Sequence, residues 1–405
     1  MTLALLRPAL FMKSPRPHWF RRWLTASLAA SLAVLTGCVP FSQRGHYEGD
    51  PVPGVAAALS PHPGHAARAA RGVDIYFIHG MGQPLTREEG RGSTARASAE
   101  LIHRALTRRG LVAGDFPGVF GAVEHGDAFD LRDAPQHAGA PVRYIRLDWI
   151  DVTADTKQRW FRADVQRNAF RLSGTQSIRR RILREGFGDV ALYLSEHAYG
   201  AAIRDSLAHK IKQVHALDHA RPPHRRGFVI THSLGSYIFA DLLQQLRHEA
   251  DSPTGNAPAA QQFVDTLDTV YMLAKQLLLL EMTRLDGLHN PPGRAAPADQ
   301  ANAPLNPETN PDPGPNLSDM THAFTRTPHP IQLVDIYDPD DLISYPLTPE
   351  LRRQYQLQGG SYRLHLTWGW VPTFGLGDFT NYDKAHSGAA TDRRVIDFII
   401  DGSPR

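Results

Sequence analysis

An apolar run that ends at a serine is the feature that most constrains this chain. Residues 227–235 read Gly-Phe-Val-Ile-Thr-His-Ser-Leu-Gly, and residues 236–246 bring apolar side chains back at helical spacing. The pattern predicts a buried strand, a sharp turn at Ser233 and a helix that starts directly behind the turn. A serine at such a place either caps the helix or is exposed as a nucleophile, and we interpret Ser233 as a nucleophile.

Several other apolar runs have the length of strands and are separated by stretches with helical periodicity. The expected strands cover residues 73–78, 142–149, 227–231, 269–273, 331–337 and 362–368, and helices are expected at about 93–109 and 393–400. Strands that alternate with helices favour a mostly parallel sheet with helices on both faces. We therefore predict an α/β fold for residues 73–405.

The strand, turn and helix around Ser233 resemble the nucleophile elbow of the α/β-hydrolase superfamily, with Thr231 in place of the first glycine of G-x-S-x-G. Thr231 is a departure from the pattern, but a small residue there still lets the strand and the helix approach each other. The resemblance covers roughly residues 73–400. It implies a serine hydrolase that acts through an acyl-enzyme and needs no metal or organic cofactor.

A serine hydroxyl needs a base within hydrogen-bond reach, and the base needs an acid that fixes its tautomer. Members of the superfamily carry these groups in the chain order Ser, Asp or Glu, His. The resemblance implies His386 as the base, on a small-residue loop between the last strand and the closing helix. We expect His365 to lie within that last strand, and His232, beside the nucleophile, to be structural.

The acid is expected in the cluster Asp338-Pro-Asp340-Asp341, which follows the penultimate strand. Asp341 fits the superfamily best, because a short apolar stretch and a turn come after it. Asp338 and Asp340 remain alternatives for the role. Calcium binding by the cluster is conceivable, but its spacing lacks the alternation of a regular calcium loop, and we predict no metal.

The loop after the first strand, His79-Gly80-Met81-Gly82, resembles the HG-containing loop of lipases and esterases. By this resemblance the amide of Met81 and the amide of Leu234, the residue after the nucleophile, form the oxyanion hole. Glycine is needed here because only a bare backbone can come close to the tetrahedral intermediate. A phosphate-binding loop is less suitable, since the segment lacks G-x-x-x-x-G-K-[ST].

The N-terminus predicts export. Residues 1–37 contain five basic and no acidic side chains, and an apolar stretch of residues 23–36, too short to span a bilayer comfortably, leads to the only cysteine, Cys38. The Leu-Thr-Gly-Cys ending looks like a bacterial lipobox, which implies lipidation of Cys38 and a membrane anchor. Val39 follows in place of Asp, which by resemblance favours the outer membrane, and Arg21-Arg22 is a weak sign of twin-arginine export.

The net charge of the chain without its signal sequence argues against a nucleic-acid partner. The chain has 44 Lys and Arg and 41 Asp and Glu, and without the five basic residues of the signal a formal charge of −2 remains. The high isoelectric point therefore reflects the export signal and does not support nucleic-acid binding.

Three further segments complete the expected organisation. Residues 38–72, rich in Gly, Pro, Ala and His, are predicted to be a flexible tether. Residues 153–222 are predicted to be a helical insertion that forms a cap over the site, basic and aromatic in its first half. Residues 287–330, rich in Pro, Asn, Ala and Gly, are predicted to be a flexible excursion. The two alternatives for the helical insertion are contact with anionic headgroups and an ordinary solvated helix face.

Together these features predict a membrane-anchored serine hydrolase that cleaves a carboxylic ester of a lipid or another substrate. Fold and triad do not choose among esterase, lipase, thioesterase and acyltransferase. The alternative from another class is a non-catalytic envelope lipoprotein that uses the same fold to bind a partner.

Overall fold

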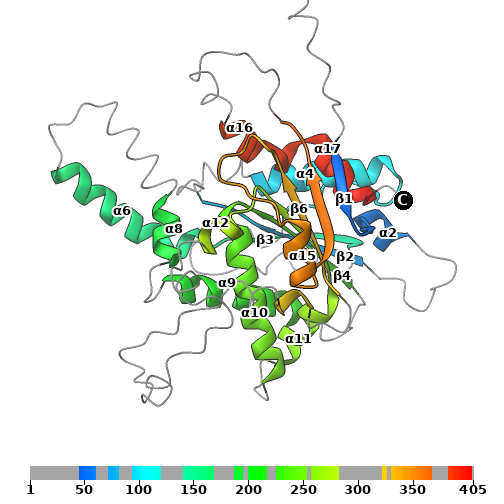
Figure 1. Cartoon of the computed structure of the whole chain (residues 1–405). Coiled ribbons are helices and arrows are strands. Elements are labelled where there is room, and N and C mark those ends of the chain that lie inside the picture. The colour runs from blue at the N-terminus through cyan, green and yellow to red at the C-terminus, as the bar shows by residue number, and fades with distance from the viewer. Residues whose placement is uncertain are drawn as a thin grey trace, which may run out of the picture. The chain divides into compact units, whose positions relative to one another are not determined.

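A seven-stranded sheet with the order β1-β7-β6-β5-β4-β2-β3 organises the chain (Figure 1). The strands are β1 (His46–Gly49), β2 (Gly72–Ile78), β3 (Val142–Leu147), β4 (Arg225–His232), β5 (Leu267–Leu273), β6 (Gln332–Tyr337) and β7 (Gln358–Arg363). Every neighbouring pair is parallel except β1 and β7, which are antiparallel. The central strands are buried on both faces, which explains why their sequences are mostly apolar.

This computed structural model describes residues 45–60, 72–81, 94–119, 140–167, 187–194, 199–216, 225–252, 257–281, 322–325, 330–366 and 382–403. These residues belong to one folded unit, Arg44–Arg405. The predicted signal sequence and Cys38 lie outside the described residues.

Helices cover both faces of the sheet, as predicted (Figure 1). One apolar core lies under α4 (Thr94–Arg108), α17 (Arg393–Asp401) and α2 (Val55–Leu59), with η3 (Gly388–Thr391) beside them. The other lies under α9 (Tyr199–Ala216), α10 (Leu234–Asp251) and α11 (Ala257–Thr266). The remaining helices are α6 (Ile150–Arg167), α8 (Phe187–Leu194), α12 (Leu277–Glu281), α15 (Pro349–Gln354) and α16 (Tyr382–Ser387).

The predicted strands are found with small shifts, except the last. Strand β7 runs from Gln358 to Arg363 and not over residues 362–368. Its start contains Gly359, at φ +99°, and Gly360, where a Cβ would lie 2.2 Å from the carbonyl oxygen of Glu48. The close approach of β1 requires Gly360, and at Gly359 an added Cβ would lie 2.3 Å from the carbonyl oxygen of Leu333 in β6. Glycine has low strand propensity, so the sequence pattern does not reveal the start of this strand.

The predicted tether is wrong for residues 45–60. Strand β1 pairs with β7, and the side chains of Val52 and Val55 are buried in the core under α17. Ser403 Oγ accepts a hydrogen bond from the amide of Val52 at 2.9 Å, which ties this segment to the end of the chain. Residues 38–44 and 61–71 lie outside the described part.

The predicted cap is also wrong in part. Helix α9 packs through Ile203, Leu207 and Ile211 into the core beside α10, so it is one of the covering helices of the sheet. Of the predicted excursion, residues 322–325 and residue 330 are described, and Ala323 and Phe324 are buried in the same core.

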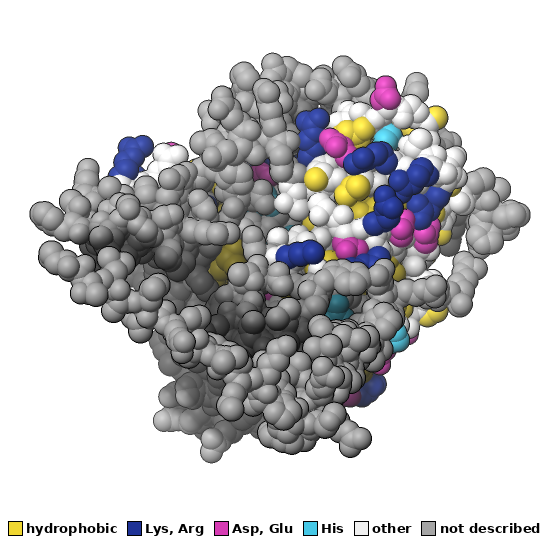
Figure 2. Space-filling model, turned by 90° about the horizontal axis from the view of Figure 1, so that it is seen from above, with side chains coloured by type: hydrophobic (Ala, Val, Ile, Leu, Met, Phe, Trp, Pro, Cys, Tyr) yellow, Lys and Arg dark blue, Asp and Glu magenta, His cyan; other side chains and the backbone are white. Residues whose placement is uncertain are grey.

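Ion pairs reinforce the sheet away from its carboxyl edge. Asp74, Arg143 and Arg225 lie near the starts of β2, β3 and β4, where the buried carboxylate of Asp74 pairs with both guanidinium groups. On the outer surface, Arg109, which directly follows α4, pairs with Asp397 and Asp401 of α17. The described surface seen from above carries basic and acidic side chains intermixed, as expected of a solvated face (Figure 2).

Candidate active site

Ser233 lies at the turn between β4 and α10, and it is buried. Its backbone has φ 53° and ψ −126°, a conformation that L-residues rarely adopt and that strained turns at functional sites retain. Its amide donates to the carbonyl oxygen of Leu273, at the end of the neighbouring strand. The predicted strand, turn and helix are therefore present, and the turn has the backbone strain that the elbow pattern requires.

Thr231 bridges the strand and the helix with its hydroxyl. Its Oγ1 donates to the carbonyl oxygen of Tyr271 at 3.4 Å and lies 2.8 Å from Oγ of Ser236. All three atoms are buried, and a glycine at position 231 would leave the hydroxyl of Ser236 without this partner. The departure from the glycine pattern thus supplies an internal hydrogen bond.

The imidazole of His386 joins Ser233 to Asp341. Its Nε2 lies 2.9 Å from Oγ of Ser233, and its Nδ1 lies 2.8 Å from Oδ2 of Asp341. Because the carboxylate accepts, Nδ1 carries the proton of the neutral ring and Nε2 can accept the serine proton. His386 lies in the last turn of α16, so the prediction that it lies on a loop is wrong, although its predicted position between the last strand and the closing helix is confirmed.

The three carboxylates of the acidic cluster have different surroundings. Asp341 has a fully buried carboxylate that faces His386, and its Oδ1 also accepts the amide of Ile343. Asp338 accepts the amides of Asp340 and Leu366 with its two oxygens, so it holds the loop together. Burial raises the pKa of Asp338. The side chain of Asp340 is 59% exposed, and the geometry therefore selects Asp341 as the partner of His386.

His365 lies after β7 and not within the strand as predicted. Its Nδ1 lies 3.7 Å from Oδ2 of Asp340 and 4.0 Å from Oδ1 of Asp338. These three side chains offer donor atoms within 4.8 Å of one another and are the group of described residues that could hold a metal ion. Both oxygens of Asp338 already accept backbone hydrogen bonds. These backbone hydrogen bonds hold the loop together whether or not an ion is bound.

His232 connects the nucleophile turn to the base. Its Nε2 donates to the carbonyl oxygen of His386 at 2.9 Å, and the two rings meet edge to face with centroids 5.1 Å apart. Burial, together with the nearby imidazole of His386, lowers the pKa of His232 to about 4. The predicted structural role of His232 agrees with this geometry, because a neutral ring bonded to a carbonyl positions α16.

The loop that carries Asp341 is anchored at its far end by a buried ion pair. Nζ of Lys275, just after β5, lies 2.9 Å from Oδ1 of Asp335 and donates to the carbonyl oxygen of Tyr345 at 2.9 Å. Oδ2 of Asp335 accepts the amide of Leu347. Burial lowers the pKa of Lys275 to about 8, against the opposing effect of Asp335. Lys275 was not among the predicted site residues, although a lysine two residues after a buried strand was an available signal.

The two predicted amide donors belong to Leu234, which follows Ser233 in the chain, and to Met81, which follows a glycine packed against Ser233. Leu234 is the first residue of α10, so its amide has no partner within the helix. Met81 follows Gly80, where an added Cβ would lie 2.7 Å from Cβ of Ser233. At Gly235 an added Cβ would lie 2.5 Å from the carbonyl oxygen of His79. Both glycines are needed for β2, its loop and α10 to approach this closely.

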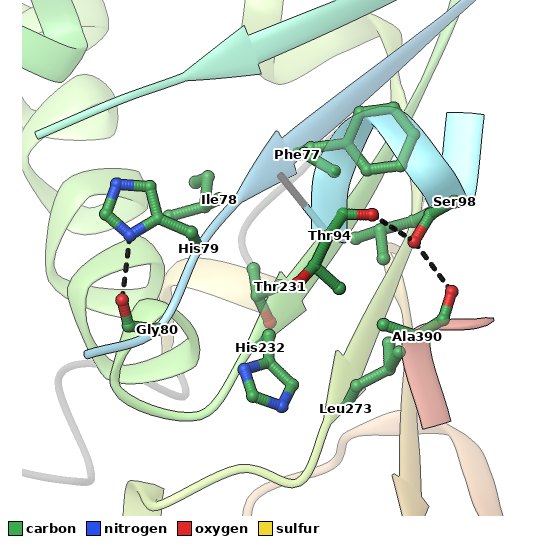
Figure 3. Close-up of a pocket in the computed structure, with 12 residues that line it drawn as sticks. Phe77, Ile78, His79, Gly80, Thr94, Ser98, Thr231, His232, Leu273 and Ala390 are labelled. Carbon is green, nitrogen blue, oxygen red and sulfur yellow. Dashed lines mark hydrogen bonds between the residues drawn. The ribbon is translucent and has the colours of Figure 1, made fainter. Parts of the chain in front are cut away.

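A small pocket lies beside this loop, between the ends of β2 and β4 and the start of α4 (Figure 3). Its volume of about 30 Å³ admits one or two water molecules. Oγ of Ser98 lies 2.6 Å from the carbonyl oxygen of Ala390 and 2.8 Å from that of Thr94, which joins α4 to η3. We therefore interpret this pocket as part of the packing around the loop and not as a site for an acyl chain.

No protein family model matches this sequence, and a search of curated proteins finds no similar chain. Among the described residues, no helix has both the length and the apolar character needed to cross a bilayer. The interpretation of the site therefore depends on its geometry.

Proposed function

We propose that this protein is a membrane-anchored serine hydrolase of the α/β-hydrolase superfamily that cleaves a carboxylic ester. The observation that carries the proposal is the continuous chain of contacts from Oγ of Ser233 through the ring of His386 to Asp341. The order of these residues in the sequence agrees with the superfamily. The strained turn at Ser233 and the mostly parallel sheet give further support.

The mechanism follows from the contacts. Oγ of Ser233 attacks the ester carbonyl carbon while Nε2 of His386 takes the hydroxyl proton, and Asp341 stabilises the resulting imidazolium. The carbonyl oxygen becomes an oxyanion that the amides of Met81 and Leu234 stabilise. The intermediate then expels the alcohol, which receives the proton from His386, and Ser233 is left acylated. A water molecule, deprotonated by His386, then attacks the acyl carbon. The acyl group leaves as the carboxylic acid, and Oγ of Ser233 takes the proton back from His386.

The helices after β3 are our candidate for a cap, limited to α6 and α8. Lys157 of α6 and Asp189 of α8 form a buried ion pair at 2.5 Å, which joins the two helices. Helix α6 begins at Ile150, shortly after β3, and Oδ2 of Asp151 in its first turn lies 3.6 Å from Nζ of Lys210 of α9. The start of α6 therefore lies at the carboxyl edge of the sheet, the edge that carries Ser233, which supports the proposed cap.

A fluorophosphonate probe tests the proposed chemistry. We expect the wild-type protein to be labelled on Ser233 and Ser233→Ala to lose all labelling, measured by gel fluorescence and peptide mass spectrometry. Ser236→Ala is the matched control, because Ser236 lies one helical turn away and its hydroxyl is hydrogen-bonded to Oγ1 of Thr231. Unlabelled wild-type protein that folds normally would contradict the proposal and favour the non-catalytic lipoprotein.

We also propose that Cys38 is lipidated and anchors the protein in the outer membrane of a bacterial envelope, facing the periplasm. The support is the sequence of residues 1–39 alone. Cys38→Ser is expected to abolish incorporation of a fatty-acid label and to release the protein from the membrane fraction, because each buried methylene contributes about 0.8 kcal/mol to anchoring. Labelled fatty acid that persists in the variant would refute lipidation at this residue.

A further inference from the structure

We propose that His79 is a positioning residue for the oxyanion hole. Its ring holds the peptide between Gly80 and Met81 in one orientation and so aims the amide of Met81. This inference rests on the proposed function, because it requires that an oxyanion forms at Ser233.

The ring of His79 turns back onto the next residue of the chain. Its Nδ1 lies 2.7 Å from the carbonyl oxygen of Gly80, as the dashed line in Figure 3 shows. A carbonyl oxygen can only accept, so Nδ1 must carry the proton. Nε2 is buried, has no hydrogen-bond partner among the described residues and lies 3.7 Å from Oδ1 of Asp148. Burial lowers the pKa of His79, which agrees with a neutral ring protonated at Nδ1 alone.

The orientation of the Gly80 carbonyl determines the direction of the Met81 amide. The two groups belong to one planar trans peptide unit, in which C=O and N–H point in opposite directions. A hydrogen bond that holds the oxygen toward the His79 ring therefore turns the N–H of Met81 away from that ring. This N–H is one of the two donors assigned to the oxyanion hole.

The backbone freedom of Gly80 makes a contact that fixes the next peptide necessary. At Gly80 an added Cβ would lie 2.7 Å from Cβ of Ser233 and 2.9 Å from the carbonyl oxygen of His232, so no other residue fits between them. Because glycine has wide backbone freedom, the peptide that follows it can rotate unless another group holds it. The hydrogen bond from Nδ1 of His79 holds the carbonyl oxygen of Gly80 and so fixes this peptide.

His79 is itself held from two sides. Its ring stacks on the indole of Trp149, with centroids 4.9 Å apart and planes inclined by 16°. Nε1 of Trp149 donates to the carbonyl oxygen of His79 at 3.1 Å, and the same oxygen faces Gly235 of α10. Contacts with Trp149, just after β3, and with the start of α10 therefore fix the position of the His79 ring. The ring in turn fixes the peptide after Gly80.

Two substitutions separate the hydrogen bond from the packing. His79→Phe keeps a flat ring for the stack on Trp149 but has no donor at the position of Nδ1. His79→Asn loses the stack but keeps an N–H one bond beyond Cγ, where Nδ1 stands in histidine. We expect His79→Phe to lower kcat for a p-nitrophenyl ester by on the order of 10²-fold with KM nearly unchanged, as for loss of one oxyanion donor. We expect His79→Asn to recover most of that loss.

The outcomes distinguish this inference from the proposed function. If wild-type protein is labelled at Ser233 but folded His79→Phe has the wild-type kcat, the positioning role is wrong and the hydrolase proposal stands. Equal losses in His79→Phe and His79→Asn would assign the ring to packing and also overturn it. If wild-type protein neither labels nor hydrolyses esters, both proposals fail. If His79→Phe does not fold, His79→Gln takes its place, because the side-chain amide of glutamine lies one bond farther from the backbone than that of asparagine. A kcat of His79→Gln equal to that of His79→Asn would then refute the positioning role.

Discussion

His386→Ala is expected to lower kcat for ester hydrolysis by about 10⁴- to 10⁶-fold while the protein stays folded. The variant removes the imidazole that lies 2.9 Å from Oγ of Ser233 and takes its proton. Loss of the base costs about as much as loss of the nucleophile, because the triad acts as a unit. Steady-state kinetics with a p-nitrophenyl ester and thermal melts of the same samples would measure the effect.

His365→Ala is the matched control for this experiment. His365 also follows β7, yet its ring is 46% exposed and faces Asp340, so kcat should stay within a few-fold of the wild-type value. Comparable losses in the two variants would show that His386 is not the base. An unchanged kcat in His386→Ala would remove the central contact of the proposed mechanism.

Asp341→Asn is expected to lower kcat by about 10⁴-fold. The carboxylate accepts from Nδ1 of His386 at 2.8 Å and is fully buried, so it fixes the tautomer that leaves Nε2 free for Ser233. An amide that donates to Nδ1 would favour the opposite tautomer, which cannot accept the serine proton. The pH dependence of kcat and the melting temperature should be measured together, to separate chemistry from folding.

The two neighbouring carboxylates give the controls. Asp340→Asn should leave kcat and the melting temperature near the wild-type values, since its side chain is exposed. Asp338→Asn should lower the melting temperature, because its oxygens accept two backbone amides, each worth roughly 0.5–1.5 kcal/mol. Its remaining folded fraction should still turn over substrate. A larger loss of turnover in either control than in Asp341→Asn would reassign the acid.

Most of the sheet was predictable because burial on both faces makes β2, β4, β5 and β6 mostly apolar in sequence. The turn at Ser233 was predictable as well, since strand, turn residues and helix are adjacent in the sequence. Where the prediction failed, the stabilising partner is distant. Strand β1 has little apolar content of its own, and it exists because it pairs with β7, more than three hundred residues later.

The choice within the acidic cluster shows the same limit. Asp338, Asp340 and Asp341 are alike in type and nearly equal in position, so the sequence alone determined that a cluster of acids follows the penultimate strand but not which of them meets the base. Only the tertiary structure distinguishes the three carboxylates. Asp341 meets the ring of His386, Asp338 binds backbone amides and Asp340 faces water. The role of the His79 ring likewise depends on the direction of one peptide bond, and side-chain and peptide directions at a loop are set by packing between distant segments.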